Sequence, residues 1–357
     1  MANMAQAIRM ALHYGEKNLN VTDIFGEDVG PPLGGVFTAT QGLETTWNSP
    51  LDERGIIGAA MGLAYAGNRC VAEIQFCDYI YNTIDLLKLA GNACWSSNGD
   101  WSVPMTVMTP VGSGIRGSIY HSHSFDATMT HIPGWKIVMP SSPLDAYGLM
   151  LTCIQDENPC MFLKPKALLR VKGEEPIPGE PSLDREGQKK LSQMIDAPLG
   201  DRTQWKAKWP EGLKDPKIPI GKGKIVHEGG DVTVVSYGRT LPLAKLVAQE
   251  LRGNDGVSVE VIDMRTLWPY DWDLISESIK KTQKVLYINE DTEVSNFGEH
   301  LVRRTIEDFF YDLKARPSLL AGEFVPGIGL ADDLEMASVP QKNHIKSKIL
   351  ELHQEVA

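Results

Sequence analysis

The first half of the chain alternates short apolar runs with stretches whose apolar residues recur at helical spacing. The N-terminal stretch carries Met4, Ile8 and Leu12 on one side, which predicts a helix. Further helices are expected over residues 78–95 and after Ser142, whose hydroxyl can cap a helix start. Apolar runs bounded by turn residues predict strands at the start of residues 21–35 and at 70–76, 104–110, 135–140 and 160–170.

The second half resumes this alternation after a break. Residues 171–219 contain seven prolines and many charges, which interrupt any periodicity, so they predict a solvated connector with at most short helices. A new α/β unit is expected to begin at Gly221. Its elements are expected to be strands at 232–238, 258–265 and 284–291 and helices at 241–253, 273–282 and 297–310, the first of these helices ending at Gly253.

Strands that alternate with helices favour an α/β fold with parallel sheets. The order of elements predicts one domain at residues 1–170, a connector at 171–220 and a smaller α/β domain at 221–357. Ligands of such sheets bind at the carboxyl ends of the strands. In the first domain these ends include Gln75 and the glycine loop 112–117.

The stretch NSPLDERGIIGAAMGLAYAG, residues 48–67, predicts a loop followed by a helix rich in glycine and alanine. Glycine inside a helix costs roughly 1 kcal/mol relative to alanine. Its three glycines therefore indicate close approach of another backbone or a ligand. A helix that is apolar on all sides is expected to be buried. From this stretch alone, Asp52 or Glu53 is interpreted as facing the positive end of the helix.

Net charge and cysteine content narrow the functional classes. The formal net charge of −11 argues against nucleic acid or an anionic membrane surface as a partner, because both would repel the chain. Five cysteines without a C-x-x-C pair indicate buried thiols in a reducing compartment. No apolar run approaches the roughly 18 residues that span a bilayer, and the N-terminus lacks the features of a signal peptide. A cytoplasmic location is therefore expected.

The loop VGSGIRGSIYHSHS, residues 111–124, contains the spacing G-x-G-x-x-G of dinucleotide sites. That pattern requires a helix to open at the glycines, and the following residues show no helical period, so a nicotinamide site is not expected. A glycine loop that delivers a histidine into a site is the better interpretation. Spacing does not decide between His121 and His123, and adding the distant His131 makes a weak zinc signal.

Other candidate groups carry less information. Gln75 and Tyr79 are typical strand-end residues, and spacing alone assigns them no function. The turn CIQDENP, residues 153–159, predicts a helix end, and its carbonyl groups and carboxylate also suit a monovalent cation. The sequence contains no Ser-His-Asp order, Walker loop or catalytic thiol signature.

Six segments of the chain recur in one protein family, in the same order. They are GEDVG (26–30), SPLDERGIIGAAMGLA (49–64), AEIQFCDYIYN (72–82), TPVGSGIRGSIYHSHS (109–124), CIQDENPCMFLKPKALLR (153–170) and VIDMRTLWPYD (261–271). Together they resemble the β chain of the thiamine-diphosphate-dependent 2-oxoacid dehydrogenases, and the fifth is most similar to branched-chain members. The resemblance implies a transketolase-like pyrimidine-binding domain followed by a smaller transketolase C-terminal-like domain.

The resemblance also assigns roles to individual positions. Glu53 matches the glutamate that hydrogen-bonds the aminopyrimidine ring of the cofactor, and Leu51, Gln75 and Tyr79 match positions of the pyrimidine pocket. His121 matches the active-site histidine near the acyl and lipoyl chemistry. Six residues match positions where this family can hold a structural potassium ion, largely through backbone oxygens: Val103, Met105, Thr106, Cys153, Asp156 and Asn158.

An absence in the sequence indicates a partner chain. No GDG…NN segment is present for the diphosphate and its Mg²⁺, so the resemblance implies an α subunit that supplies this half of the site. The expected assembly has two α and two β chains. It decarboxylates a branched-chain 2-oxo acid or pyruvate and passes the acyl group to a lipoylated acyltransferase. Two alternatives stay open: a self-sufficient transketolase-type enzyme, and a catalytically silent assembly paralogue.

Overall fold

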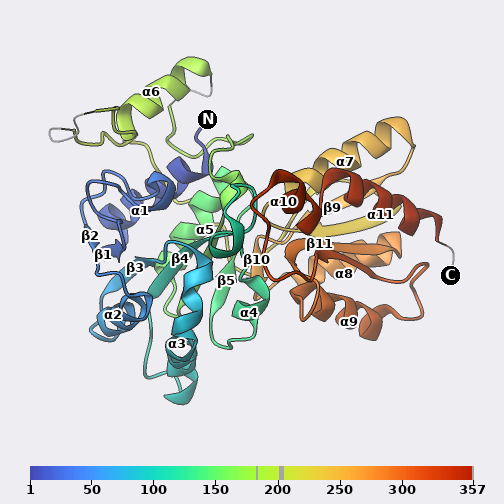
Figure 1. Ribbon diagram of the computed structural model, residues 1–357, viewed down its shortest axis with the longest axis horizontal. Coiled ribbons are helices and arrows are strands. Elements are labelled where there is room, and N and C mark those ends of the chain that lie inside the picture. Colours follow the sequence, from blue (N-terminus) through green and yellow to red (C-terminus); the bar gives the residue numbers. More distant parts are fainter. Residues whose placement is uncertain (182–183, 201–204, 356–357) are drawn as a thin grey trace. The chain divides into compact units, whose positions relative to one another are not determined.

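Two compact units make up the chain in the computed structural model, which describes residues 1–181, 184–200 and 205–355 (Figure 1). Unit 1 comprises Met1–Pro110, His131–Lys164 and Leu168–Ile220, and unit 2 comprises Val111–Thr130, Pro165–Ala167 and Gly221–Ala357. The loop that carries His121 thus groups with unit 2. Within the described ranges, no helix has both the length and the apolar character needed to cross a membrane.

Unit 1 is built on a sheet of parallel strands. They are β1 (Val21–Gly26), β2 (Thr46–Asn48), β3 (Arg69–Glu73), β4 (Met105–Val111), β5 (Lys136–Val138) and β6 (Cys160–Pro165). The strands lie in the order β5-β6-β4-β3-β1-β2, and the pairs β1–β2, β1–β3, β3–β4 and β5–β6 are parallel. Strands β4 and β6 are buried along their whole length, as expected for interior strands of a parallel sheet.

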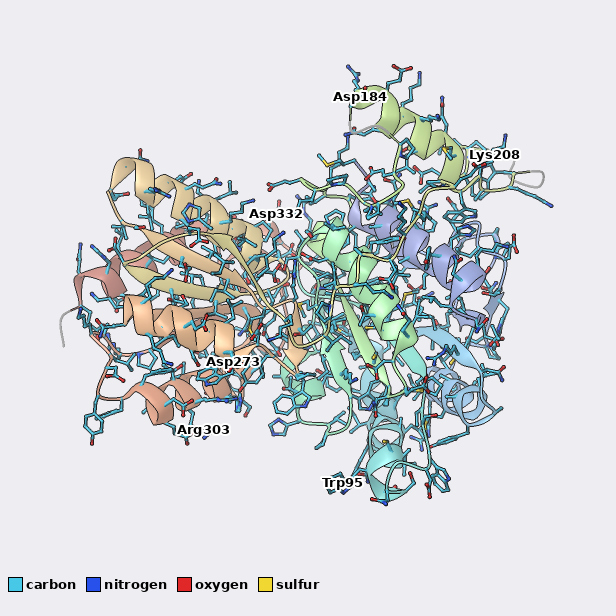
Figure 2. All side chains as sticks on the ribbon, turned by 180° about the vertical axis from the view of Figure 1, so that it is seen from behind. Trp95, Asp184, Lys208, Asp273, Arg303 and Asp332 are labelled. Atoms are coloured by element: carbon cyan, nitrogen blue, oxygen red, sulfur yellow. The ribbon has the colours of Figure 1, made fainter. Side chains whose placement is uncertain are left out.

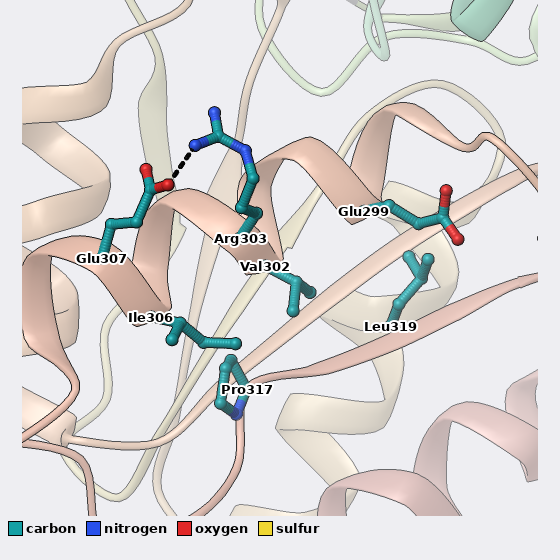
Figure 3. Close-up of a pocket in the computed structure, with 7 residues that line it drawn as sticks. All are labelled: Glu299, Val302, Arg303, Ile306, Glu307, Pro317 and Leu319. Atoms are coloured by element: carbon teal, nitrogen blue, oxygen red, sulfur yellow. Dashed lines mark hydrogen bonds and ion pairs between the residues drawn. The ribbon is translucent and has the colours of Figure 1, made fainter.

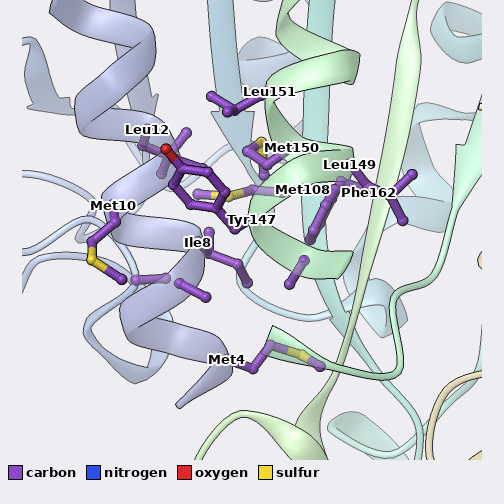
Figure 4. Packing of buried hydrophobic residues seen from close by; sticks show 14 of the residues in the cluster. Met4, Ile8, Met10, Leu12, Met108, Tyr147, Leu149, Met150, Leu151 and Phe162 are labelled. Atoms are coloured by element: carbon purple, nitrogen blue, oxygen red, sulfur yellow. The ribbon is translucent and has the colours of Figure 1, made fainter. Parts of the chain in front are cut away.

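Helices α1 (Met4–Asn18) and α5 (Pro143–Gln155) pack together in unit 1. Their facing residues, among them Ile8, Leu12 and Tyr147, belong to one buried cluster (Figure 4). Helix α5 begins where the sequence predicts, because the hydroxyl of Ser142 accepts a hydrogen bond from the Asp145 amide (3.2 Å). The predicted cap is confirmed.

Residues 78–95 do not form the single helix that the sequence predicts. Cys77–Thr83 is a 3₁₀ helix, and α3 (Ile84–Ser96) follows it. The buried hydroxyl of Thr83 donates to the Ile80 carbonyl (2.6 Å), a local bond that competes with regular α-helical bonding. The 3₁₀ segment carries Tyr79, so the correction affects a predicted site residue.

Two predicted element ends are also wrong. Strand β6 ends at Pro165, which has no N–H to donate to a sheet, and a 3₁₀ turn over Lys166–Leu168 follows. Helix α7 (Thr240–Asn254) continues through Gly253 instead of ending there. A Cβ at Gly253 would meet no other described residue within 4 Å, and Gly253 does not have a positive φ, so neither crowding nor backbone conformation ends the helix at this glycine.

The connector is part of unit 1 and not a solvated linker. It contains helix α6 (Arg185–Ile195), whose first turn is capped by Asp184 (Figure 2). Ile177, Leu191 and Ile195 are buried in the core of unit 1. The expectation of a solvated linker is therefore wrong, because apolar residues between the prolines dock this segment onto the unit.

The buried guanidinium of Arg9 fixes the connector to α1. Its Nη1 donates to the Ile195 carbonyl (2.7 Å) and to Gln41 Oε1 (3.2 Å), and its Nη2 pairs with Asp196 (2.6 Å). The Arg9 side chain is fully buried, and this desolvation lowers its pKa. A buried cation needs such partners to offset the loss of water.

Unit 2 holds a mixed sheet. Its strands are β7 (Lys224–His227), β8 (Val232–Ser236), β9 (Val259–Asp263), β11 (Val285–Thr292) and β12 (Ser318–Gly322), in the order β12-β11-β8-β9-β7. Strand β7, which the sequence does not predict, is antiparallel to β9, and the other pairs are parallel. The remaining elements are α4 (Asp126–Thr130), α7, β10 (Thr266–Trp268), α8 (Trp272–Thr282), α9 (Phe297–Phe309), α10 (Asp332–Ser338) and α11 (Lys342–Gln354).

Candidate active site

Glu53 stands at the first position of helix α2 (Glu53–Tyr65). Its Oε2 accepts a hydrogen bond from Asn82 Nδ2 (3.3 Å), and the positive end of the helix favours a carboxylate there. Asp52 occupies the cap position without making a capping hydrogen bond. A Cβ at Gly55 would come within 2.6 Å of the Asp52 carboxylate, which explains the first glycine of this helix.

Helix α2 is buried on one side only. The buried side consists of Ile56, Ile57, Ala60, Met61 and Ala64. Gly58, Ala59 and Gly62 are exposed. Among the described residues, nothing lies within 4 Å of a Cβ placed at Gly62. The expectation of a helix buried on all sides is therefore wrong, and no backbone within the described ranges accounts for the glycines at positions 58 and 62.

A second carboxyl group, Glu27, interacts with Glu53. Glu27 follows β1, whose last residue Gly26 is in register with Glu73 at the end of β3. Burial raises the pKa of Glu27, and the charges of Glu53 and Asp28 raise it further. Glu27 Oε1 is buried and has no hydrogen-bond partner in the part of the chain that the structure describes. The carboxyl end of β1 and the start of α2 thus hold an acidic pair, Glu27 and Glu53, that still needs a hydrogen-bond donor.

The structure brings two of the other predicted pocket residues to this pair. Burial raises the pKa of Tyr79, and the charges of Asp78, Glu27 and Glu53 contribute in that order. Gln75 Nε2 donates to the carboxylate of Asp28 (3.0 Å), next in sequence to Glu27. Leu51, two residues before Glu53, is 82% exposed.

A buried ion pair supports the same end of the sheet. Glu73 and Lys164 are both fully buried and form a salt bridge. The other carboxylate oxygen of Glu73 accepts a hydrogen bond from the Val36 amide (2.9 Å). Gly35 has φ = 75°, and a Cβ there would lie 2.5 Å from Thr40 Oγ1. Glu73 therefore fixes the glycine loop that follows Glu27.

His121 belongs to unit 2, directly after the 3₁₀ turn Ser118–Tyr120. Its Nδ1 lies 3.2 Å from the Gly117 carbonyl. A neutral ring that donates to this carbonyl carries its proton on Nδ1 and keeps Nε2 as its basic nitrogen. His123 contributes its backbone, because its carbonyl accepts a hydrogen bond from the Gly112 amide (2.7 Å).

Two acidic side chains of unit 2 anchor the glycine loop that leads to His121. Glu290 Oε2 accepts hydrogen bonds from Ser113 Oγ (2.8 Å) and from Arg239 Nε (2.7 Å). Glu335 Oε1 accepts one from the Gly114 amide (2.6 Å). The loop that carries the histidine is thus tied to the sheet of unit 2 at its first glycines.

The six residues that match a potassium site lie at the turn between α5 and β6 and at the start of β4. The Val103 amide donates to the Glu157 carbonyl (2.8 Å), and the Asp156 amide donates to the Cys153 carbonyl (3.2 Å). Asp156 Oδ1 accepts hydrogen bonds from the backbone and the side chain of Asn158 (2.9 and 3.2 Å). In the described ranges, no group of three or more His, Cys, Asp or Glu is placed to hold a metal ion.

Two pockets lie apart from these residues. One, of about 980 Å³ in unit 1, is lined by residues 29–46 and parts of the connector, including Trp205 and Trp209. Figure 3 shows the other, of about 600 Å³, on α9 and β12, where Arg303 pairs with Glu307. None of the residues that the resemblance assigns lines either pocket.

Comparison with known proteins agrees with the two-unit architecture. The transketolase pyrimidine-binding domain matches residues 1–172, and the transketolase C-terminal domain matches residues 221–345. The 2-oxoisovalerate dehydrogenase subunit beta of Bacillus subtilis is 33% identical over 354 residues, which cover 97% of each chain. The chain belongs to the β-subunit family of 2-oxoacid dehydrogenases.

Other members of this β-subunit family give similar matches. The 2-oxoisovalerate dehydrogenase subunit beta of Pseudomonas aeruginosa is 36% identical over 90% of this chain and 87% of the relative. The pyruvate dehydrogenase E1 component subunit beta of Acholeplasma laidlawii is 33% identical over 89% and 88%. A solved structure described as a split gene transketolase, inactive beta4 tetramer, covers all of both chains with a TM-score of 0.69 and 17% identity, which shows the fold.

Sequence reasoning missed three side chains around the candidate site of this β-subunit chain: Glu27, Glu73 and Asn82. Glu27 gave a usable signal, because it directly follows a strand in GEDVG, where ligand-binding residues of parallel sheets are found. Glu73 gave none, because its partner Lys164 is 91 residues away. The helix predicted over residues 78–95 includes Asn82, and it is the 3₁₀ segment found in its place that brings the Asn82 amide to Glu53.

Proposed function

We propose that this chain is the β subunit of an enzyme that oxidatively decarboxylates a branched-chain 2-oxo acid or pyruvate and transfers the acyl group to a lipoyl group. The single observation that carries the proposal is the acidic pair Glu53 and Glu27, with Tyr79 and Gln75 beside it. An α subunit, in an assembly of two α and two β chains, supplies the residues for the diphosphate and its Mg²⁺.

The acidic pair suits the aminopyrimidine ring of thiamine diphosphate. Glu27 Oε1 is a buried acceptor without a donor among the described residues, and an aminopyrimidine offers an amino group and a ring nitrogen that can be protonated. Glu53, Gln75, Tyr79 and Leu51 would hold this ring. When bound, thiamine diphosphate supplies a carbon nucleophile and an electron sink for decarboxylation.

The proposed task of Glu53 is to hold and exchange a proton at the ring nitrogen. The charge of Glu53 already raises the pKa of Glu27, so the two carboxyl groups interact electrostatically. An N–H donor that bonds to both would relieve their repulsion. The proposed task of His121 is acid–base chemistry at the acyl and lipoyl groups, with Nε2 as its basic nitrogen. The Glu290 and Glu335 contacts position its loop for this task.

Substitution of Glu53 tests the proposal directly. Glu53→Ala, co-expressed with the α subunit, is expected to lower turnover by about 10²–10⁴, the scale of a lost acid–base group. The matched control is Asp52→Asn, which removes the neighbouring carboxylate that makes no capping bond and is expected to keep its activity. Assays with pyruvate and 2-oxoisovalerate identify the substrate. Near-wild-type turnover of Glu53→Ala at saturating cofactor and α subunit would contradict the proposal.

Cofactor binding to the chain without its partner separates this function from a self-sufficient transketolase-type enzyme. The chain alone is expected neither to bind thiamine diphosphate tightly nor to turn over, because it lacks the diphosphate segment. Isothermal titration calorimetry measures this. Tight, stoichiometric binding would favour the self-sufficient enzyme.

A further inference from the structure

The turn that follows helix α5 gathers negative charge. The carbonyl groups at the end of a helix carry the negative end of its dipole, and the carboxylates of Asp156 and Glu157 lie in the same turn. A cation belongs at such a place, and the resemblance to the β-subunit family suggests a potassium ion.

Arg69, the first residue of β3, supplies a cation from the chain itself. Its Nη1 donates to the carbonyls of Ile154 (2.9 Å) and Asp156 (3.1 Å), and its Nη2 pairs with the carboxylate of Glu157. The guanidinium thus binds two backbone oxygens and one side chain of the turn. Its planar fork of donors suits such convergent oxygens.

Lys136, the first residue of β5, supplies a second cation. Its Nζ pairs with Asp156 Oδ2, while Asp156 Oδ1 is bonded to Asn158. Both oxygens of this carboxylate are therefore in use. The Lys136 amide also donates to the Pro159 carbonyl (3.0 Å), so this lysine is held at the turn by its backbone as well.

The residues present do not fit a potassium ion in addition. The carbonyls of Val103, Cys153 and Asp156 accept hydrogen bonds from the Met105 amide (2.7 Å), the Asp156 amide (3.2 Å) and Arg69, respectively. An ion that used the Asp156 oxygens would lie next to the charges of Arg69 and Lys136, and like charges at such range repel strongly.

We infer that Arg69, together with Lys136, takes the place of the potassium ion at the α5–β6 turn, so that this chain folds stably without a monovalent cation there. The inference concerns the folded chain and does not depend on the proposed activity. It predicts a difference from any relative that has a short neutral side chain at the position of Arg69.

The test is thermal unfolding of the full chain at constant ionic strength, with potassium chloride replaced stepwise by choline chloride. The wild-type midpoint is expected to stay the same. Arg69→Ala is expected to lower the midpoint in choline by about 2–4 °C or more and to regain part of the loss with potassium, in a saturable way. Arg69→Gln serves the same purpose should the alanine variant not fold, and Arg69→Lys is expected to keep the potassium independence.

Arg54→Ala is the matched control, because Arg54 pairs with Asp85 on the surface of the same unit and both side chains are at least half exposed. It is expected to gain no response to potassium. Crystals soaked in thallium(I), an anomalous scatterer of similar size to potassium, give a second readout: no peak at the turn in the wild type, and a peak in Arg69→Ala. A saturable, potassium-specific rise of the wild-type midpoint would overturn the inference. So would an Arg69→Ala variant that responds to potassium no more than Arg54→Ala.

Discussion

Each unit buries a carboxyl group beside its sheet, and the two units neutralise it in different ways. In unit 1, Glu73 is fully buried against Lys164, so the acid meets an opposite charge. In unit 2, Asp126 is 1% exposed and lies beside a second acid, Asp291, and the phenol of Tyr237. In unit 1 the opposite charge of Lys164 compensates the buried carboxylate for the loss of water. In unit 2 the carboxyl group avoids this loss by keeping its proton.

The surroundings of Asp126 favour its protonated form. Burial raises the pKa of Asp126 well above its ordinary value, and the negative charge of the neighbouring Asp291 raises it further. The Tyr237 hydroxyl donates to Asp126 Oδ2 (2.6 Å) and opposes this rise. Two neighbouring carboxyl groups in a buried site share a proton because both cannot ionise cheaply.

In each unit, an acid at this buried site holds a loop of the candidate active site in place: Glu73 in unit 1, and Asp291, the neighbour of Asp126, in unit 2. Glu73 accepts a hydrogen bond from the Val36 amide in the loop after Glu27. Asp291 accepts one from the Ala127 amide (3.0 Å), just beyond the histidine loop. Replacing the carboxyl group by an amide should therefore lower the stability strongly at position 73 and only mildly at position 126. Only the change at position 73 leaves a buried charge without an opposite charge.

The largest effect is expected for Glu73→Gln. The change leaves the Lys164 ammonium buried without an opposite charge, and breaking a buried pair in this way costs about 3–5 kcal/mol. Denaturant unfolding of the full chain near neutral pH measures the loss. The double variant Glu73→Gln with Lys164→Met removes the stranded charge and is expected to recover most of it. A loss below about 1 kcal/mol, the size seen for exposed pairs, would show that charge pairing is not what neutralises Glu73.

A smaller, pH-dependent effect is expected for Asp126→Asn. The folded-state pKa of Asp126 lies above its ordinary value of 3.8, so above that pH the folded chain binds more protons than the unfolded chain. The stabilisation is complete below pH 3.8 and is lost as the pH rises through the folded pKa, at up to about 1.4 kcal/mol per pH unit. Asparagine has no proton to lose, so the variant is expected to lack this decline.

Unfolding free energies measured from about pH 4 to 9 check this, with hydrogen exchange at the Ala127 amide as a local probe. Glu73→Gln is the useful counterpart, because the loss of stability that it causes is expected to persist across this pH range. If Asp126→Asn keeps the pH dependence of the wild type, then a group other than Asp126 retains the proton and the contrast between the units fails.

The sequence placed the main candidate residues because their signals are local. The pair Asp52 and Glu53 is marked by a loop, a helix start and an apolar period within a few residues, and the pair His121 and His123 by a glycine loop after a strand. The alternation of strands and helices predicted two α/β units for the same reason. The resemblance then gave these positions their expected roles, which short-range periodicity does not supply.

What the sequence did not predict depends on contacts between distant segments. No period links Glu73 to Lys164 or Asp126 to Tyr237, which are 91 and 111 residues apart. The buried face of the connector was missed although Leu191 and Ile195 stand at helical spacing in a stretch without proline, because so short a pattern does not show which surface it packs against. The exposed glycine face of α2 was missed because an apolar pattern shows which residues suit burial, and not which chain covers them.

The smallest effect, and the sharpest test of the retained proton, is expected for Tyr237→Phe. The phenol donates to Asp126, and such a bond stabilises the ionised carboxylate more than the neutral acid. Its loss raises the pKa of Asp126 further, so the decline of stability with pH extends to higher pH. The variant is expected to lose about 1 kcal/mol in acid, where Asp126 is protonated, and about 1.5–3 kcal/mol in alkali, where it is charged.

Tyr287→Phe is the control, because the Tyr287 hydroxyl is also buried in unit 2 but bonds to Thr305 Oγ1 (2.6 Å) instead of a carboxyl group. This variant is expected to lose about 1 kcal/mol at every pH, the worth of one neutral hydrogen bond. Equal pH profiles for the two variants would mean that Asp126 keeps the same charge in the folded chain throughout. The inference that Asp126 in unit 2 retains its proton would then be wrong. The inference that Lys164 neutralises Glu73 in unit 1 would be unaffected, because Glu73→Gln tests it separately.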